Sequence, residues 1–288
     1  MKRKTKTFLS TIFLIATIAI FLSVQISKAQ TGDLKVWIFD VGQGDSIFIK
    51  TPKGIDVLID GGEGKDVLEE LGEALPFWDH HINLVILTHP HADHVNGLVE
   101  VLKRYDVDQI LEPGKNSETS GYLGFLHEIE NNNIKKTITK SEQKILLEDN
   151  IFINILWPES NVNEIEDIND TSIVTKLSYG NIDFLLTGDA TSEVEKEILD
   201  QNLDSEFLKV GHHGSRYSSS ANFLAQVGPL VSFISAGKDN RFNHPHDETL
   251  TRLEEVGSKI LRTDQNGTIK VTVEEDGDWD IWCEKDCN

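Results

Sequence analysis

The feature that most constrains this chain is a histidine-rich segment at residues 88–94 (THPHADH). It contains His89, His91, Asp93 and His94, so three imidazoles and a carboxylate fall within six residues. An apolar core cannot bury such side chains without partners, whereas imidazole and carboxylate groups are ligands of zinc, manganese and iron. An apolar run (LVIL, residues 84–87) precedes the segment, which therefore lies at the carboxyl end of a predicted buried strand. This spacing predicts a site for two adjacent metal ions rather than a histidine-rich surface loop.

Three further groups of polar residues adjoin predicted elements. Asp189 follows the apolar strand 182–188, His212 and His213 follow the strand 206–210, and His244 and His246 precede the helix 247–256. Asp189 alone is also consistent with a cap of the helix that begins near residue 191, and the last two histidines with a capping or lining role. Because α/β layers carry active sites at the carboxyl ends of strands, we expect these side chains to join the histidine segment.

The remaining sequence alternates short β-rich runs with helical runs, which indicates a mixed α/β (α+β) fold. The predicted strands are residues 34–39, 46–50, 55–60, 84–87, 107–111, 172–179, 182–188, 206–210, 230–235, 259–262 and 268–273, and residues 145–157 indicate two more. The predicted helices are residues 65–75, 95–104, 121–132, 191–199 and 247–256. No repeat and no low-complexity linker interrupts this pattern, so we predict one domain over residues 30–288.

The first 29 residues have the pattern of a signal peptide. Four basic residues within positions 2–6 precede an uncharged apolar run at 8–24, and small residues at 27 and 29 flank a cleavage site before Gln30. We therefore predict cleavage and export; an uncleaved N-terminal anchor is the alternative, although the run is short for a membrane span. In an exported protein, Cys283 and Cys287 could form a disulfide, a question that their spacing leaves open.

The charge balance of the chain limits its partners. The 288 residues include 48 acidic and 27 basic side chains, a formal charge of −21. Residues 1–29 carry five basic and no acidic side chains, so their removal would leave −26. Such a surface repels phosphate polymers at long range, and a nucleic-acid substrate would have to be held by a bound metal or a local basic patch.

Several motifs together resemble the metallo-β-lactamase superfamily of metal-dependent hydrolases, and within it the metal-binding domain of ComEC-type DNA-uptake competence proteins. The segments that carry the resemblance are 39–46 (FDVGQGDS), 58–62 (LIDGG), 87–95 (LTHPHADHV), 186–190 (LTGDA) and 209–215 (KVGHHGS). The resemblance covers residues 34–273. It implies an αββα sandwich, in which two mixed β-sheets lie between layers of helices.

The resemblance also implies roles for individual residues. His89 and His91 would bind a first divalent metal ion, Asp93 and His94 a second, and Asp189 would bridge the two. Either His212 or His213 would complete the second metal's ligands, and the sequence leaves that choice open. Asp60 and Asp40 would orient the histidine segment from behind. The candidate catalytic residues are Asp93, His246 and His244, of which His246 or His244 would protonate the leaving oxygen. Zinc is the expected metal, with manganese as the alternative.

The chain departs from the family pattern at one ligand position. Many members carry a third imidazole for the first metal, but this chain has no histidine between His127 and His212. Asn169 and Asp170 occupy the expected region, so an oxygen ligand would replace the imidazole or the first metal would bind weakly. An oxygen-richer site shifts metal preference from zinc toward manganese.

The resemblance predicts a secreted hydrolase that uses a metal-activated water, with a phosphoester substrate in DNA or in a cell-wall component. The predicted activity is that of a phosphodiesterase, either a nuclease or a wall or choline-phosphate esterase. Hydrolysis of amide, lactone or β-lactam bonds is the second possibility, because the same fold supports it. A non-catalytic metal-binding module is the third. We expect no transmembrane channel segment, unlike in the ComEC-type proteins, and the sequence does not indicate an oligomeric state.

Overall fold

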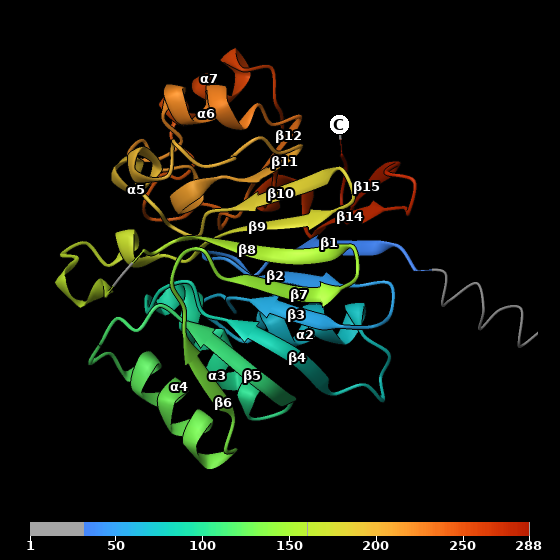
Figure 1. Cartoon of the computed structure of the whole chain (residues 1–288), viewed down its shortest axis with the longest axis vertical. Helices are drawn as coiled ribbons and strands as arrows, with labels where there is room; N and C mark the ends of the chain where they lie inside the picture. Colours follow the sequence, from blue (N-terminus) through green and yellow to red (C-terminus); the bar gives the residue numbers. More distant parts are fainter. Residues whose placement is uncertain (1–31, 160, 288) are drawn as a thin grey trace, which may run out of the picture.

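The computed structural model describes residues 32–159 and 161–287. The predicted signal peptide, residues 1–29, lies outside the described residues. Two β-sheets pack against each other, and helices cover the outer face of each (Figure 1). Within the described ranges, no helix combines the length and the apolar character that crossing a bilayer requires.

The first sheet has the strand order β15-β14-β1-β2-β3-β4-β5-β6. Its strands are β1 (Leu34–Ile38), β2 (Ile47–Lys50), β3 (Asp56–Ile59), β4 (His81–Ile86), β5 (Asp106–Glu112), β6 (Lys135–Ile138), β14 (Ile269–Val273) and β15 (Trp279–Cys283). Strands β3 to β6 run parallel, and the remaining pairs are antiparallel. The parallel strands therefore direct their carboxyl ends to one edge of the sheet.

The second sheet has the order β13-β12-β11-β10-β9-β8-β7. Its strands are β7 (Lys144–Glu148), β8 (Ile151–Trp157), β9 (Val174–Tyr179), β10 (Ile182–Leu186), β11 (Phe207–Lys209), β12 (Val231–Ile234) and β13 (Lys259–Arg262). Strands β10 to β13 are parallel. Like the first sheet, it thus combines an antiparallel half with a parallel half.

The helices fall into two groups. They are α2 (Asp66–Ala74), α3 (Ala92–Leu102), α4 (Ser120–Asn131), α5 (Ser192–Glu197), α6 (Ala221–Val227), α7 (Asp247–Glu255) and α8 (Thr263–Asn266), with single 3₁₀ turns at η1 (Val162–Glu164), η2 (Asn169–Thr171) and η3 (Gly211–Gly214). In Figure 1, α5, α6 and α7 lie at the top with the second sheet, and α3 and α4 lie at the bottom with the first.

Alternating side chains build three apolar layers. In β1, Leu34, Val36 and Ile38 point between the sheets, where they meet residues of the second sheet such as Phe184 and Phe207. A second layer joins the first sheet to α2, α3 and α4, and a third joins the second sheet to α5, α6 and α7. Since both faces of each sheet are covered, the central strands are apolar throughout, as expected for buried mixed sheets. The predicted αββα sandwich is confirmed.

Four helices and strands were not predicted from the sequence: β6, β15, α6 and the four-residue α8. Strands β6 (KKTI) and β15 (WDIWC) end the first sheet and are mostly exposed, so neither shows the apolar run of a buried strand. The helix α6 has only seven residues. Cys283 and Cys287, which the sequence left open, form a disulfide.

Glu70 of α2 is expected to make stability depend on pH. Burial, together with the nearby Glu284 and Glu73, raises the pKa of Glu70 from 4.5 to about 7, although Thr268 donates a hydrogen bond to it at 2.7 Å. A carboxyl whose folded pKa is raised costs stability as pH rises from 4.5 to about 7. Glu70→Gln should therefore increase the free energy of unfolding at pH 8 by about 1 kcal/mol, after allowance for its partial exposure, and by much less at pH 4.5. Urea denaturation at both pH values tests this, and an equal effect at both would contradict it.

Candidate metal centre

The histidine segment connects strand β4 to helix α3. Strand β4 ends at Ile86, and α3 begins at Ala92 rather than near residue 95 as the sequence pattern predicted. The difference arises because His91, in an extended conformation, is the N-cap, and its carbonyl accepts the amide hydrogen bond of Val95 at 2.9 Å. Asp93 and His94 therefore lie in the first helical turn, which fixes their direction relative to His89.

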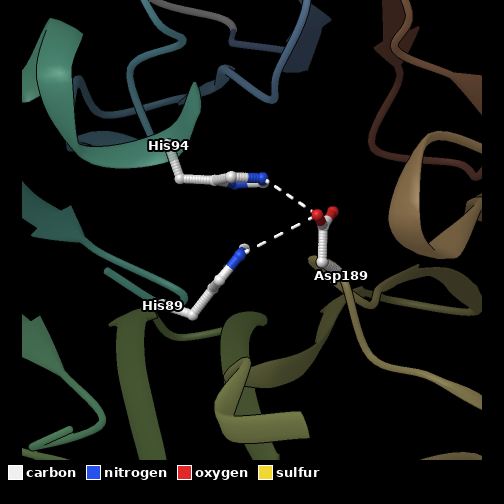
Figure 2. A group of neighbouring side chains, drawn as sticks. All are labelled: His89, His94 and Asp189. Carbon is white, nitrogen blue, oxygen red and sulfur yellow. Dashed lines mark ion pairs between the residues drawn. The ribbon is translucent and has the colours of Figure 1, made fainter. Parts of the chain in front are cut away.

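Side chains from both sheets converge at the carboxyl ends of β4, β10 and β11. Oδ2 of Asp189 lies 3.3 Å from Nε2 of His94, 3.3 Å from Nε2 of His213 and 3.8 Å from Nε2 of His89. Figure 2 shows the rings of His89 and His94 directed at this carboxylate. Oδ2 of Asp93 lies 3.4 Å from Nε2 of His213. Asp189 is thus central to the cluster.

His91 faces the same space from the loop before α3. Its Nδ1 lies 3.1 Å from Nε2 of His89, and the two ring centroids are 4.7 Å apart. His91 is partly exposed, whereas His89 is fully buried. The two rings therefore contact each other, while Asp93 and His213 form a separate contact within the cluster.

The turn at η3 directs the side chains of the two candidate histidines, His212 and His213, to different places. His212 and His213 both adopt left-handed backbone conformations, with φ of 51° and 54°, between two glycines. Nδ1 of His213 lies 3.0 Å from the carbonyl oxygen of Ser235, so its Nε2 is directed toward Asp189. His212 instead lies beside His244, with ring centroids 5.5 Å apart. The structure brings His213 into the cluster and leaves His212 next to it.

Asp60 lies behind the histidine segment, where the sequence analysis placed it. Its carboxylate accepts hydrogen bonds from the amide and the hydroxyl of Thr88, at 2.8 and 2.6 Å, and contacts Nδ1 of His94 at 2.8 Å. All three residues are buried. Asp60 therefore fixes both the loop and the ring orientation of His94, as carboxylates behind metal-binding histidines commonly do.

Asp40 does not lie behind the histidines. Its carboxylate lies 3.4 Å from the ammonium of Lys285 and 3.4 Å from the amide of Gly42. Asp45, which the sequence analysis missed, is the buried carboxylate there: Oδ1 lies 3.3 Å from Nδ1 of His213, and Oδ2 accepts a hydrogen bond from Lys209 at 2.6 Å. Two signals in the sequence pointed to Asp45: it directly precedes the apolar run 46–50, and it lies in the segment 39–46 that carries the family resemblance.

The region of the missing third histidine supports the cluster through hydroxyl and carboxylate groups. Asp170 accepts hydrogen bonds from the hydroxyl and amide of Thr191, at 2.6 and 3.3 Å, which ties η2 to the loop after Asp189. Ser172 lies 3.3 Å from Nδ1 of His89 and accepts the amide of Asp189 at 3.1 Å. Oδ1 of Asn169 is buried and has no partner among the described residues.

The electrostatics of the cluster centre on Asp189. Burial alone would raise its pKa, but His213 and His94 hold the pKa well below the ordinary value. Burial alone would lower the pKa of His94 and of His213, but Asp189 raises both well above 6.5. Burial lowers the pKa of His89 well below 6.5. A carboxylate thus sits between two proton-holding imidazoles, and metal binding at such a site displaces the protons.

The residues fit divalent metal ions. Nε2 of His94, Nε2 of His213 and Oδ1 of Asp189 are buried and lack hydrogen-bond partners among the described residues, a costly arrangement that a cation would relieve. Ligand atoms of Asp93, His94 and His213 lie within 4.8 Å of one another, as do those of His89, His94 and Asp189. Nitrogen and carboxylate donors of this kind suit zinc and manganese alike.

His244 and His246 lie beside the cluster. The ring centroid of His244 lies 4.9 Å from the ring centroid of His246 and 6.2 Å from that of His213. Burial, together with His213, lowers the pKa of His244 to about 4, so this ring is neutral at pH 7. Nδ1 of His246 accepts the amide of Arg216 at 3.2 Å. Both imidazoles are therefore placed to contact a ligand of the cluster.

The separate positions of His212 and His213 lead to a direct prediction. We expect His213→Ala to weaken zinc binding by roughly 100-fold or more, because it removes a nitrogen directed at Asp93 and Asp189. His212→Ala should bind zinc as the unmodified protein does. Competition with a zinc-binding dye measures both, and an equal loss in the two variants would contradict the assignment.

The comparisons with known proteins agree with this geometry. A family model described as the metallo-beta-lactamase superfamily matches residues 39–238. ComE operon protein 3 of Bacillus subtilis is 31% identical over 265 residues, covering 82% of this chain and 32% of that protein. Recombination protein 2 of Haemophilus influenzae is 30% identical over 264 residues, covering 89% of this chain and 31% of that protein. The chain thus spans about a third of the length of these curated relatives.

A solved structure shows the same fold. The metallo-beta-lactamase fold protein YhfI from Bacillus subtilis aligns with a TM-score of 0.55 and 12% identity, over 87% of this chain and 99% of that one. The family model spans the strands and loops that carry His89, Asp189 and His213. The sandwich, the metal-binding cluster at the strand ends and the sequence match all agree: the chain belongs to the metallo-beta-lactamase superfamily.

Proposed function

We propose that the chain is a metal-dependent phosphodiesterase. The observation that carries the proposal is the position of Asp189, whose Oδ2 lies 3.3 Å from His94 and from His213 and 3.8 Å from His89. A carboxylate in this position can serve two cations at once. Two divalent ions held there would supply an activated water and neutralise charge on a phosphoryl group.

The neighbouring imidazoles supply groups that a phosphodiester needs. Within the described part of the chain, Nδ1 of His212 and of His244 is buried and has no hydrogen-bond partner, and both rings are only partly buried, so their Nε2 atoms are the groups that could meet phosphoryl oxygens. His244 is neutral at pH 7 and can donate a hydrogen bond without delivering a proton. Nδ1 of His246 is engaged by Arg216, which leaves its Nε2 to protonate the leaving oxygen.

Two substrate classes follow from this proposal. The relative named recombination protein 2 supports a polynucleotide, whereas the formal charge of −21 disfavours long-range attraction to DNA. A cell-wall or choline-phosphate diester is compatible with that charge. Either substrate would be met outside the cytoplasm if the signal peptide is cleaved. We accordingly propose export, which predicts a secreted protein that begins at Gln30 when its N-terminus is sequenced from culture medium.

The test is hydrolysis of bis-p-nitrophenyl phosphate by the mature chain. The protein is first stripped of metal and then supplied with zinc or manganese. We expect turnover to return with at least one metal, after which single-stranded DNA and wall phosphodiesters are compared as substrates. Absence of turnover in a protein that binds metal tightly, together with hydrolysis of a lactone or β-lactam, would replace the proposal with amide or lactone hydrolysis.

A further inference from the structure

A fully buried ion pair lies behind the metal centre. Lys209 has no exposed surface and Asp45 is 1% exposed, and Nζ lies 2.6 Å from Oδ2. Nζ also donates to the carbonyl of Val210 at 3.0 Å. Lys209 ends β11 of the second sheet, and Asp45 precedes β2 of the first, so the pair joins the two sheets at the edge that carries the ligands. Burying two charges is costly, and a pair of this kind rarely adds stability over apolar side chains.

The other oxygen of Asp45 faces a predicted ligand. Oδ1 lies 3.3 Å from Nδ1 of His213 and has no hydrogen bond with any described residue. The carbonyl oxygen of Ser235 lies 3.0 Å from the same nitrogen. The carbonyl accepts the hydrogen bond of Nδ1 and the carboxylate lies close behind the ring, an arrangement that directs Nε2 toward Asp93 and Asp189. A carboxylate in this position fixes the orientation of a metal-binding imidazole and makes it a stronger donor.

His94 has the same support. Oδ2 of Asp60 lies 2.8 Å from Nδ1 of His94, whose Nε2 faces Asp189. Both imidazoles on the Asp93 side of the cluster are therefore backed by buried carboxylates. That side is preorganised by two buried carboxyl groups, one held by Thr88 and the other by Lys209.

His89 and His91 lack this support. Nδ1 of His89 faces the hydroxyls of Thr88 and Ser172, at 3.1 and 3.3 Å. Nδ1 of His91 faces His89. Within residues 32–159 and 161–287, no carboxylate bonds to the outer nitrogen of either ring. Hydroxyls orient an imidazole but do not increase its basicity as a carboxylate does.

We propose that the two metal positions differ in their affinity for metal and that Lys209 causes the difference. Lys209 is a positioning residue: it holds Asp45 behind His213 and so makes the position of Asp93, His94 and His213 the tighter one. The position of His89 and His91 fills only at higher metal concentration. Without Lys209, the buried charge of Asp45 would be uncompensated, and its carboxylate would turn toward the cation instead of supporting His213.

The test is a zinc titration of metal-free protein, measured by competition with chelators of graded affinity. The unmodified protein should bind one zinc ion at least about 10-fold more tightly than the second. Lys209→Met should weaken the tighter event by about 10- to 100-fold and leave the weaker one within about twofold. His89→Ala should remove the weaker event alone. These readouts do not depend on hydrolysis, so they stand whether or not the chain is a phosphodiesterase.

The chain offers a matched control. Lys176 of β9 is also buried in the second sheet, 4% exposed, and lies 2.8 Å from Asp183 and 2.6 Å from the carbonyl of Asp204. Lys176→Met should lower thermal stability as Lys209→Met does, but leave both zinc affinities unchanged. If Lys209→Met lowers stability and leaves the tighter zinc affinity unchanged, Lys209 is purely structural and the proposal fails.

A second variant covers the case in which Lys209→Met does not fold. Asp45→Asn keeps the shape of the side chain and removes the charge behind His213. It should weaken the tighter zinc event by about 10-fold. Two events of equal affinity in the unmodified protein, or loss of the tighter event in His89→Ala, would overturn the assignment.

Discussion

Asp189→Asn is expected to lower phosphodiester hydrolysis by about 10³-fold, equivalent to about 4 kcal/mol of transition-state stabilisation. The substitution keeps the shape of the side chain but removes the charge that lies within 3.3 Å of His94 and His213. Without it, cations would be held by neutral imidazoles and Asp93 alone. Zinc binding should weaken together with turnover of bis-p-nitrophenyl phosphate, as measured by metal content after dialysis.

Asp183→Asn provides the control for that experiment. Asp183 lies on the same strand, β10, but its carboxylate pairs with Lys176 at 2.8 Å, away from the cluster. This variant should keep its zinc and its turnover within about twofold. Full metal content and unchanged turnover in Asp189→Asn would refute the role assigned to Asp189.

Gly97→Ala is expected to destabilise the fold by about 3 kcal/mol and to disturb the metal centre. A Cβ at this position of α3 would overlap the carbonyl oxygen of Gly61, and it would lie 3.1 Å from that of Gly64. Both obstacles are main-chain atoms that cannot rotate away. The amide of Gly97 bonds to Gly62 at 3.0 Å, so a displaced helix would lose this contact and would carry His94 away from Asp189.

A second helical glycine serves as the comparison. Gly72 of α2 has no atom within 4 Å of the position that a Cβ would take. Gly72→Ala should therefore stabilise the protein by about 0.5–1 kcal/mol, because alanine favours the helix. Urea unfolding and zinc affinity measured on both variants separate the effects. A Gly97→Ala protein as stable as the unmodified chain would show that α3 can shift without cost.

The sequence predicted the parts of the site that are encoded locally. His89, His91, Asp93 and His94 fall within six residues after a strand, and Asp189 follows a strong apolar strand, so strand ends alone bring them together. In the structure β10 and β11 are adjacent and parallel, so Asp189 and the turn at 211–214 leave the sheet at the same edge.

The parts that could not be predicted depend on contacts between distant residues or on backbone conformation. Asp45 and Lys209 are 164 positions apart, and neither shows in the sequence that it is buried. The choice between His212 and His213 rests on two consecutive left-handed residues, which composition does not reveal. The sequence analysis named Asp40 and did not consider Asp45; both follow the first predicted strand, and only the turn at 41–44 distinguishes them.

The metal ligands come from both halves of the sandwich: the histidine segment follows β4 of one sheet, and Asp189 and His213 follow β10 and β11 of the other. A cation bound there would be coordinated by residues of both sheets. Because a ligand that binds only the folded state increases the free energy of unfolding, this cation would stabilise the protein. Where zinc and manganese are scarce, a larger fraction of the protein would be open to proteases. The lifetime of the protein would then follow the metal supply of its surroundings, and scarcity would remove the protein as well as its activity.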